Sequence, residues 1–179
     1  MHLSRLICAA VALALCCASP ASAQEAAIAG FGAFTPLPQA QEQPDPTRDY
    51  KVVFDISGAA KAVDQVNPGL DRVARLVNML AAGGVPAEKR RIALVVHGGA
   101  TDSVASDAAY AKRHEGRKNP NTALIAALQA AGVSVRICGQ AMTARGFQPA
   151  DLAPGVQVDL AALMTTMHLQ LDGYALVVN

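Results

Sequence analysis

Residues 91–99 read RIALVVHGG, and this stretch decides the fold class. The run at 91–96 is nearly continuously apolar, and therefore predicts a strand that is buried on both of its faces. Similar runs at 50–56 (YKVVFDI) and 133–137 (VSVRI) predict two more strands, and weaker ones follow at 156–159 and 174–178. Strands that are buried on both faces are typical of a parallel sheet covered by helices.

Helix signals separate the predicted strands. Asn67-Pro68 provides an N-cap and a first helical residue, and Gly83-Gly84 ends the apolar pattern that follows. Asn119-Pro120 repeats this signal and predicts a helix that continues to about residue 131. Further helical stretches are expected at 102–117, directly after Cys138, and at 161–171. The alternation of strands and helices predicts a single-domain, three-layer α/β fold with a mostly parallel sheet.

The first 23 residues have the three parts of a secretory signal peptide. His2 and Arg5 precede an apolar run at 6–17, and Ala21-Ser22-Ala23 provides a cleavage site. We expect export to the periplasm and a mature chain that starts at Gln24 and has no attachment to the membrane. Residues 24–49 are rich in Ala, Gln and Pro and are expected to form a flexible leader, so the folded domain is predicted at 50–179.

Charge and motif content exclude several function classes. The 15 basic and 14 acidic residues become 14 and 14 once Arg5 is removed, so we expect no nucleic-acid partner. The basic cluster at 112–118 is interpreted as a solvated helix end rather than an anion site. The histidines and cysteines lack the spacing of metal ligands, and neither a Walker A loop nor a G-x-G-x-x-G motif is present. We therefore expect no metal and no other cofactor.

Cys138 is the one cysteine that remains after the predicted cleavage. It ends the strand at 133–137, and ligand and reaction sites of parallel sheets lie beyond the carboxyl ends of the strands. At the amino end of a following helix, exposed N–H groups would favour its thiolate, and Arg145 could return toward the sulfur. The alternative is an inert buried thiol that packs like a small apolar side chain.

Three polar residues are expected at the same edge of the sheet. His97 follows the strand at 91–96, where it could act as a base or orient a ligand, or could simply bind loop backbone. Asp55 and Ser57 end the first strand, and each could contribute to the site or bind its own turn. Gly98 and Gly99 resemble an oxyanion-hole loop, but the chain has no G-x-S-x-G motif, which excludes an esterase.

The two other histidines of the predicted domain are not expected to be ligands. His114 is expected to be solvated at a polar helix end. His168 lies in the apolar stretch at 163–171 and is expected to be a core or interface residue rather than a ligand.

With these residues in view, the chain resembles the DsrE/DsrF-like family, which includes YchN-like proteins, and most of all its exported single-domain branch. The resemblance covers residues 50–179 and rests on four segments, namely 66–70 (VNPGL), 95–99 (VVHGG), 119–121 (NPN), and 135–141 (VRICGQA) through Arg145-Gly146. It implies a five-stranded parallel sheet and assembly into trimers or hexamers. It also implies that Cys138, supported by Gly139, Gln140 and Arg145, carries sulfur as a persulfide.

The sequence is compatible with two functions. In the first, the protein is a sulfur carrier or sulfurtransferase-like protein rather than a turnover enzyme, and exchanges sulfur through Cys138 with a donor or acceptor protein. In the second, it is a non-catalytic oligomeric protein that binds a small ligand at the carboxyl edge of the sheet with His97, Asp55 and Cys138. The stretch at 163–171 is a candidate subunit contact, or alternatively part of the core.

Overall fold

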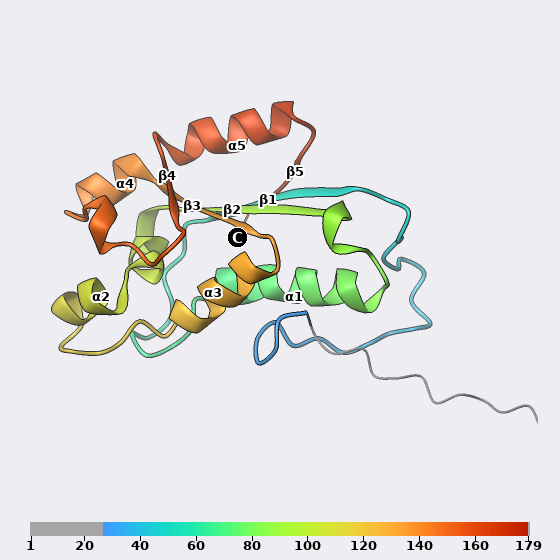
Figure 1. Ribbon diagram of the computed structural model, residues 1–179, viewed down its shortest axis with the longest axis horizontal. Helices are drawn as coiled ribbons and strands as arrows, with labels where there is room; N and C mark the ends of the chain where they lie inside the picture. The colour runs from blue at the N-terminus through green and yellow to red at the C-terminus, as the bar shows by residue number, and fades with distance from the viewer. Residues whose placement is uncertain (1–26, 179) are drawn as a thin grey trace, which may run out of the picture.

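A computed structural model describes residues 27–178, which form a five-stranded parallel sheet covered by helices on both faces (Figure 1). The strand order is β4-β3-β2-β1-β5. The strands are β1 (Tyr50–Ile56), β2 (Arg90–Val96), β3 (Ser134–Cys138), β4 (Gln157–Asp159) and β5 (Ala175–Val178). Every neighbouring pair is parallel, so the predicted α/β fold is confirmed.

The helices form two layers, one on each face of the sheet (Figure 1). On one face lie α1 (Pro68–Ala82) and α3 (Thr122–Ala130), and on the other lie α4 (Gly139–Ala144) and α5 (Ala162–Leu171). The remaining elements are α2 (Asp107–Arg113) and the 3-10 helices η1 (Ala87–Lys89), η2 (Gly98–Val104) and η3 (Pro149–Asp151). None of the helices within residues 27–178 is both long and apolar enough to cross a membrane.

The main core lies between the sheet and the α1–α3 layer. Phe54, Leu94 and Ile137 point into it from three neighbouring strands, and α1 contributes Leu70 and Val73. Side chains alternate between the two faces of a strand, and a smaller apolar cluster covers the opposite face of β2 beneath α5. The central strand is therefore buried on both faces, as its sequence predicts.

The helix α1 begins where the sequence predicts, but α3 does not. Asn67 caps α1, because its Oδ1 accepts a hydrogen bond from Gly69 N at 2.8 Å. The second Asn-Pro pair instead forms a turn in which Asn119 Oδ1 accepts from Asn121 N at 2.9 Å, and α3 starts only at residue 122. The buried Asn119 amide also donates to Ser103 O and Ala105 O, so tertiary contacts override the local signal.

The helix predicted at 102–117 is also divided in the structure. Its first residues belong to η2, and α2 starts only after Ser106, whose hydroxyl accepts a hydrogen bond from Ala109 N at 3.2 Å. A serine N-cap inside an otherwise helical pattern is therefore the boundary that the prediction missed.

Residues 27–49, here called the strap, pack against α1, and the expected flexible leader is wrong for this part of the chain. The buried Asn78 amide binds Ile28 N at 2.8 Å, Ile28 O at 3.2 Å and Phe31 O at 2.9 Å. Ile28 itself lies in the main core. The strap has no helix or strand, and therefore no periodic pattern, which is why the sequence indicated a leader. The predicted signal peptide at 1–23 lies outside the described residues.

Two glycines of the strap offer a matched test of this packing. Gly30 and Gly32 both have positive φ, but a Cβ on Gly30 would meet open space, whereas one on Gly32 would lie 2.3 Å from Arg75 N. We expect Gly30→Ala to lower the free energy of unfolding by about 1 kcal/mol through backbone strain alone. Gly32→Ala should lower it by about 3 kcal/mol, since backbone atoms of α1 must also move.

Urea unfolding measures both free energies, and limited proteolysis reports whether the strap is released. Gly32→Ala should be cleaved within residues 27–49 faster than the wild type. Equal stability of the two variants would show that the strap does not pack on α1.

Candidate functional site

The candidate site lies at the carboxyl edge of the sheet, where the register brings three strands level. Ile56 is paired with Val96, and Val96 with Ile137. His97 and Cys138 therefore follow in the next row, and Asp55, which is paired with Val95, lies two rows before them. Because side chains alternate along strands, these three residues share the face that α4 and α5 cover. The sequence-predicted residues are thus brought to one edge, although only some of them contact one another.

Cys138 ends β3 and is the N-cap of α4. Its side chain is 7% exposed and packs against Val95 and Ala162. Sγ accepts a hydrogen bond from Ala141 N at 3.5 Å. Within residues 27–178 it is the single free cysteine. The sulfur thus lies in a small apolar setting with one backbone N–H directed at it.

The two residues after Cys138 position α4 against β4. A Cβ on Gly139 would lie 2.7 Å from Asp159 O, so only glycine permits this close approach. The Gln140 amide donates to Leu160 O at 3.3 Å. Both residues therefore hold the chain beside the thiol.

His97 is directed toward Asp55 on the neighbouring strand and not toward the thiol. His97 Nε2 and Asp55 Oδ1 form a hydrogen bond, and the two side chains are 29% and 27% exposed. Among the described residues, no hydrogen bond joins His97 to Cys138. The pair can orient a ligand or exchange a proton at the edge, with the carboxylate fixing the ring orientation.

Ser57, Gly98 and Gly99 form the loop beside this pair. Ser57 acts through its backbone, since its carbonyl accepts a hydrogen bond from Ala100 N at 3.1 Å. Gly98 has φ +54°, and a Cβ on Gly99 would lie 3.2 Å from Ser57 O. The two glycines thus allow η2 to begin against the end of β1, which is a structural role.

The structure directs Arg145 to a carboxylate that the sequence analysis missed. Its Nε and Nη2 bind Asp102 Oδ1 at 3.0 and 2.9 Å. His114 Nε2 contacts the other oxygen of Asp102 at 3.1 Å and is largely buried, so the expected solvated histidine is wrong. Arg145 lies 43 residues after Asp102, and no local pattern marks the two as partners. Arg145 therefore links α4 to η2 instead of facing the sulfur.

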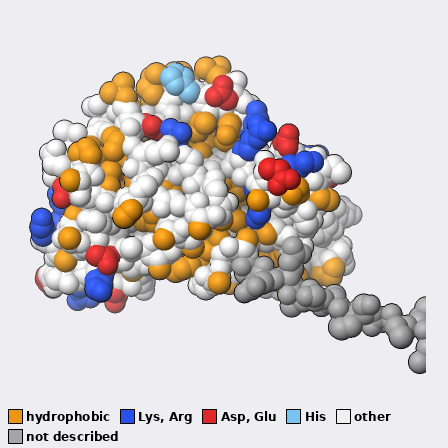
Figure 2. All heavy atoms as spheres, in the orientation of Figure 1, with side chains coloured by type: hydrophobic (Ala, Val, Ile, Leu, Met, Phe, Trp, Pro, Cys, Tyr) orange, Lys and Arg blue, Asp and Glu red, His pale blue; other side chains and the backbone are white. Residues whose placement is uncertain are grey.

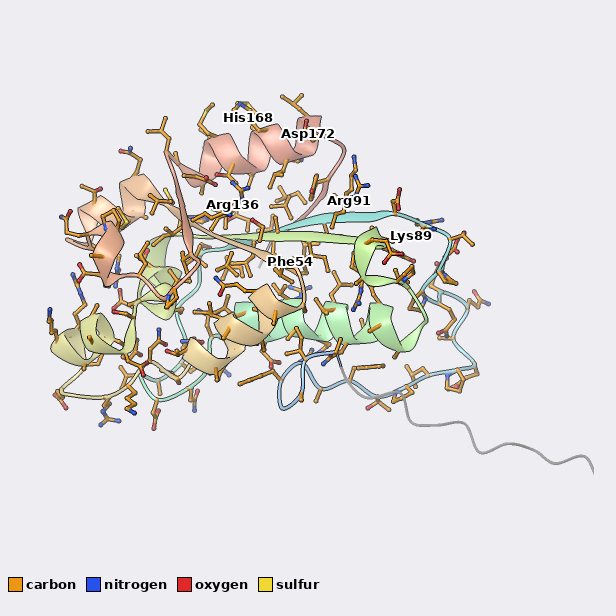
Figure 3. All side chains as sticks on the ribbon, viewed as in Figure 1. Phe54, Lys89, Arg91, Arg136, His168 and Asp172 are labelled. Atoms are coloured by element: carbon orange, nitrogen blue, oxygen red, sulfur yellow. The ribbon has the colours of Figure 1, made fainter. Side chains whose placement is uncertain are left out.

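A second missed ion pair lies beneath α5. Arg136 Nη1 contacts both carboxylate oxygens of Asp159 at 3.1 Å, and Thr165 Oγ1 donates to Asp159 Oδ2 at 2.7 Å. Figure 3 shows Arg136 between the sheet and α5. Asp159 is the β4 partner of Cys138 in the sheet register, so this network holds β3, β4 and α5 together beside the thiol.

His168 and the ends of its helix lie at the surface. Figure 3 shows His168 on the outer side of α5, and its side chain is exposed. Leu163 and Leu171 are 75% and 78% exposed, so the core alternative for these residues is wrong. Among residues 27–178, no cluster of histidine, cysteine and acidic side chains could hold a metal ion.

Tyr110 makes the stability of the fold depend on pH. Burial raises the pKa of its phenol above the ordinary value of 10.0, and the Asp102 and Asp64 carboxylates raise that pKa further. Its hydroxyl donates to Val63 O at 2.7 Å, and its ring contacts that of His114 at 4.0 Å. The native state therefore retains a proton that the unfolded chain releases at a lower pH.

This shift predicts that stability is intact below about pH 10 and falls as the pH rises through the native pKa of Tyr110. Tyr110→Phe should cost about 1 kcal/mol near neutral pH by removing the hydrogen bond. It should also reduce the alkaline loss of stability. Urea unfolding near neutral pH and above about pH 10 measures both effects, with Tyr174→Phe as the control. An alkaline loss that is unchanged in Tyr110→Phe would contradict the prediction.

Comparisons with known proteins agree with this architecture. A model of the DsrE/DsrF-like family matches residues 39–178. No curated protein matches the sequence significantly. A protein of unknown function, MTH1491 from Methanobacterium thermoautotrophicum, has 22% identity and a TM-score of 0.56, with 73% of this chain and 100% of that chain covered. The ychN protein from E. coli has 18% identity and a TM-score of 0.53, with 73% and 99% covered. The chain therefore belongs to the DsrE/DsrF-like family.

Proposed function

We propose that this protein is an exported sulfur-handling member of the DsrE/DsrF-like family, in which Cys138 accepts sulfane sulfur as a persulfide. The position of the Cys138 thiol in the sheet supports this proposal. Cys138 lies at the carboxyl end of β3, at the edge where parallel sheets place reactive groups. The family, which is often linked to sulfur relay, adds to this support. The role is that of a carrier or sulfurtransferase-like protein rather than a turnover enzyme.

The proposed step is a thiol exchange with a persulfide donor of the form R–S–SH. The Cys138 sulfur attacks the terminal sulfur, the S–S bond of the donor breaks, and a new S–S bond forms on Cys138. The products are Cys138–S–SH and R–SH, so the two protons are conserved and no oxidant, reductant or metal is required. The Ala141 N–H lies 3.5 Å from Sγ and is directed at the attacking sulfur.

The proposal includes a location and a protein partner. Residues 1–23 direct the chain to the periplasm, and a donor or acceptor protein with its own thiol exchanges sulfur with Cys138. The secretory pattern of the N-terminal sequence supports the first part. The exchange step supports the second part, since it requires a persulfide donor and releases a thiol.

We also propose that the protein forms a trimer or hexamer through α5. An apolar surface patch, here called the α5 patch, surrounds this helix and consists of Leu160, Leu163, Met167, Leu171 and Val178. Figure 2 shows hydrophobic side chains on both sides of a histidine at this surface. Large exposed apolar patches on soluble proteins mark interaction sites.

A second function is favoured by the exposed His97–Asp55 pair. Its side chains remain partly accessible at the edge, and within residues 27–178 they form a side-chain hydrogen bond only with each other. In this alternative the edge binds a small polar ligand, and Cys138 is an inert part of the wall.

Sulfur loading of Cys138 distinguishes the two functions. We expect the purified protein to gain the mass of one sulfur atom on Cys138 after treatment with glutathione persulfide. Cys138→Ser should abolish the gain with an unchanged circular dichroism spectrum. Arg145→Gln should retain most of it, because Arg145 binds Asp102 and not the sulfur. Mass spectrometry of intact and digested protein gives the readout. An unmodified Cys138 in protein that carries a bound metabolite would contradict sulfur handling and favour ligand binding.

The oligomer is tested separately from the chemistry. Light scattering at micromolar concentration should give the mass of a trimer or hexamer. Leu163→Asp with Leu171→Asp should reduce that mass, since each places a charge in the α5 patch. Gln170→Asp adds a charge at another exposed position of α5 and should leave the mass unchanged. A monomeric wild type would rule out the assembly.

A further inference from the structure

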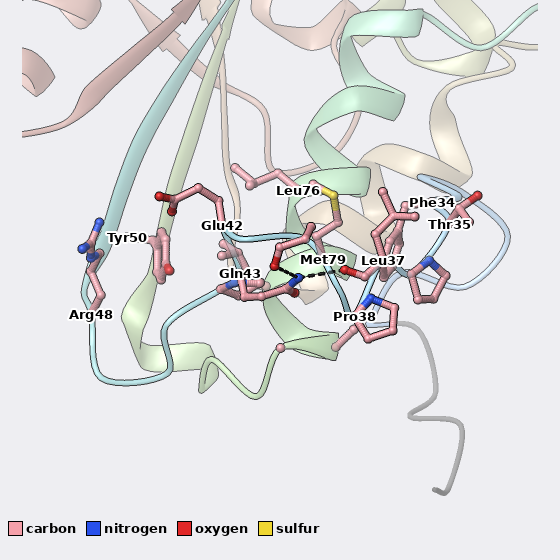
Figure 4. A pocket seen from close by; sticks show the side chains of 16 residues that line it. Phe34, Thr35, Leu37, Pro38, Glu42, Gln43, Arg48, Tyr50, Leu76 and Met79 are labelled. Atoms are coloured by element: carbon pink, nitrogen blue, oxygen red, sulfur yellow. Dashed lines mark hydrogen bonds between the residues drawn. The ribbon is translucent and has the colours of Figure 1, made fainter.

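A groove lies between the strap and the last turns of α1, at the end of the sheet opposite to Cys138. Its volume is about 590 Å³, within the range of small-molecule sites. Phe34 and Leu37 line it from the strap, Tyr50 from β1, and Leu76, Met79 and Leu80 from α1. Figure 4 shows these lining side chains, with Leu37 from the strap and Met79 from α1.

The groove is preformed because the strap is fixed on both sides of it. Before the groove, Asn78 holds Ile28, and Gly32 N donates to Asp71 Oδ1 at 2.8 Å. At its other end, within the lining itself, Pro44 packs so closely on the end of α1 that a Cβ on Gly83 would lie 2.4 Å from it. The residues between these contacts arch over the apolar side of α1, and a ligand need not order them.

The polar groups of the groove indicate what kind of molecule it would take. The Gln43 amide already donates to Leu37 O at 2.8 Å and to Ala40 O at 2.9 Å. The Tyr50 hydroxyl accepts from Asp45 N at 2.7 Å. The charged lining residues are Glu42 and Arg48, whose charges have opposite sign. The lining therefore offers an apolar surface without a net charge.

We propose that this groove binds a small, uncharged, predominantly apolar molecule, either aliphatic or aromatic. Shape and apolar contact provide the recognition, since the polar lining groups described above are engaged within the strap or compensate each other. The family match starts at residue 39, so the part of the strap that holds Ile28 and Gly32 lies outside the matched region. The site is independent of Cys138 and of the proposed sulfur chemistry.

The test uses N-phenyl-1-naphthylamine as a neutral fluorescent probe, with decanol and decanoate as competitors. We expect one probe per chain, displaced by decanol at lower concentration than by decanoate. Met79→Glu from the α1 side and Leu37→Gln from the strap side should each weaken probe binding at least about tenfold, which corresponds to 1.4 kcal/mol. Met79→Leu keeps the apolar surface and should bind like the wild type.

Two controls exclude other surfaces and other occupants. Leu163→Gln alters the exposed α5 patch and should leave probe binding unchanged, whereas a loss there would place the probe on that patch and overturn the proposal. Full binding by both groove variants would also overturn it, as would tighter binding of decanoate than of decanol. If the wild type binds no probe, the groove is closed by a second copy or by another segment of the chain, and the proposal is wrong. Light scattering then identifies a second copy.

Discussion

The constraint on which the structure depends is that β2 is paired on both edges and buried on both faces. Residues 92–96 of this strand are shielded from water on both faces, so their side chains must be apolar and helices must cover both sides. Parallel neighbours also need long crossover connections, and these provide the covering helices. The order β4-β3-β2-β1-β5 follows this arrangement, with the shortest strands at the two edges.

The same parallel register creates the candidate site. Because the carboxyl ends of β1, β2 and β3 lie level, the residues that follow them meet at one edge although they are far apart in the sequence. The side chains at and near this edge form separate pairs. His97 pairs with Asp55, Arg145 with Asp102, and Cys138 with the backbone N–H of α4. The thiol thus has a position typical of a reactive group without a side-chain base bonded to it.

At the end of the sheet opposite to Cys138, the buried amide of Asn78 likewise brings distant parts of the chain together. Asn78 is a polar side chain on the buried face of α1, and burial of its amide is favourable only because backbone groups of the strap satisfy it. That requirement holds a segment without regular structure against α1. The groove beneath the strap exists because close glycine contacts fix the chain on both sides and leave the middle arched.

The sequence by itself determined the elements whose signal is local. The apolar run of β2, the Asn67 cap of α1 and the position of Cys138 at a strand end can all be read within a few residues, since each depends on neighbours along the chain. The tertiary structure alone decided which side chains meet. Asn119 forms a turn rather than a helix cap because its amide donates a hydrogen bond to η2. Arg145 does not face the sulfur because its guanidinium binds Asp102. The strap packs because of a hydrogen-bond partner 50 residues away, and no periodic pattern encodes such a contact.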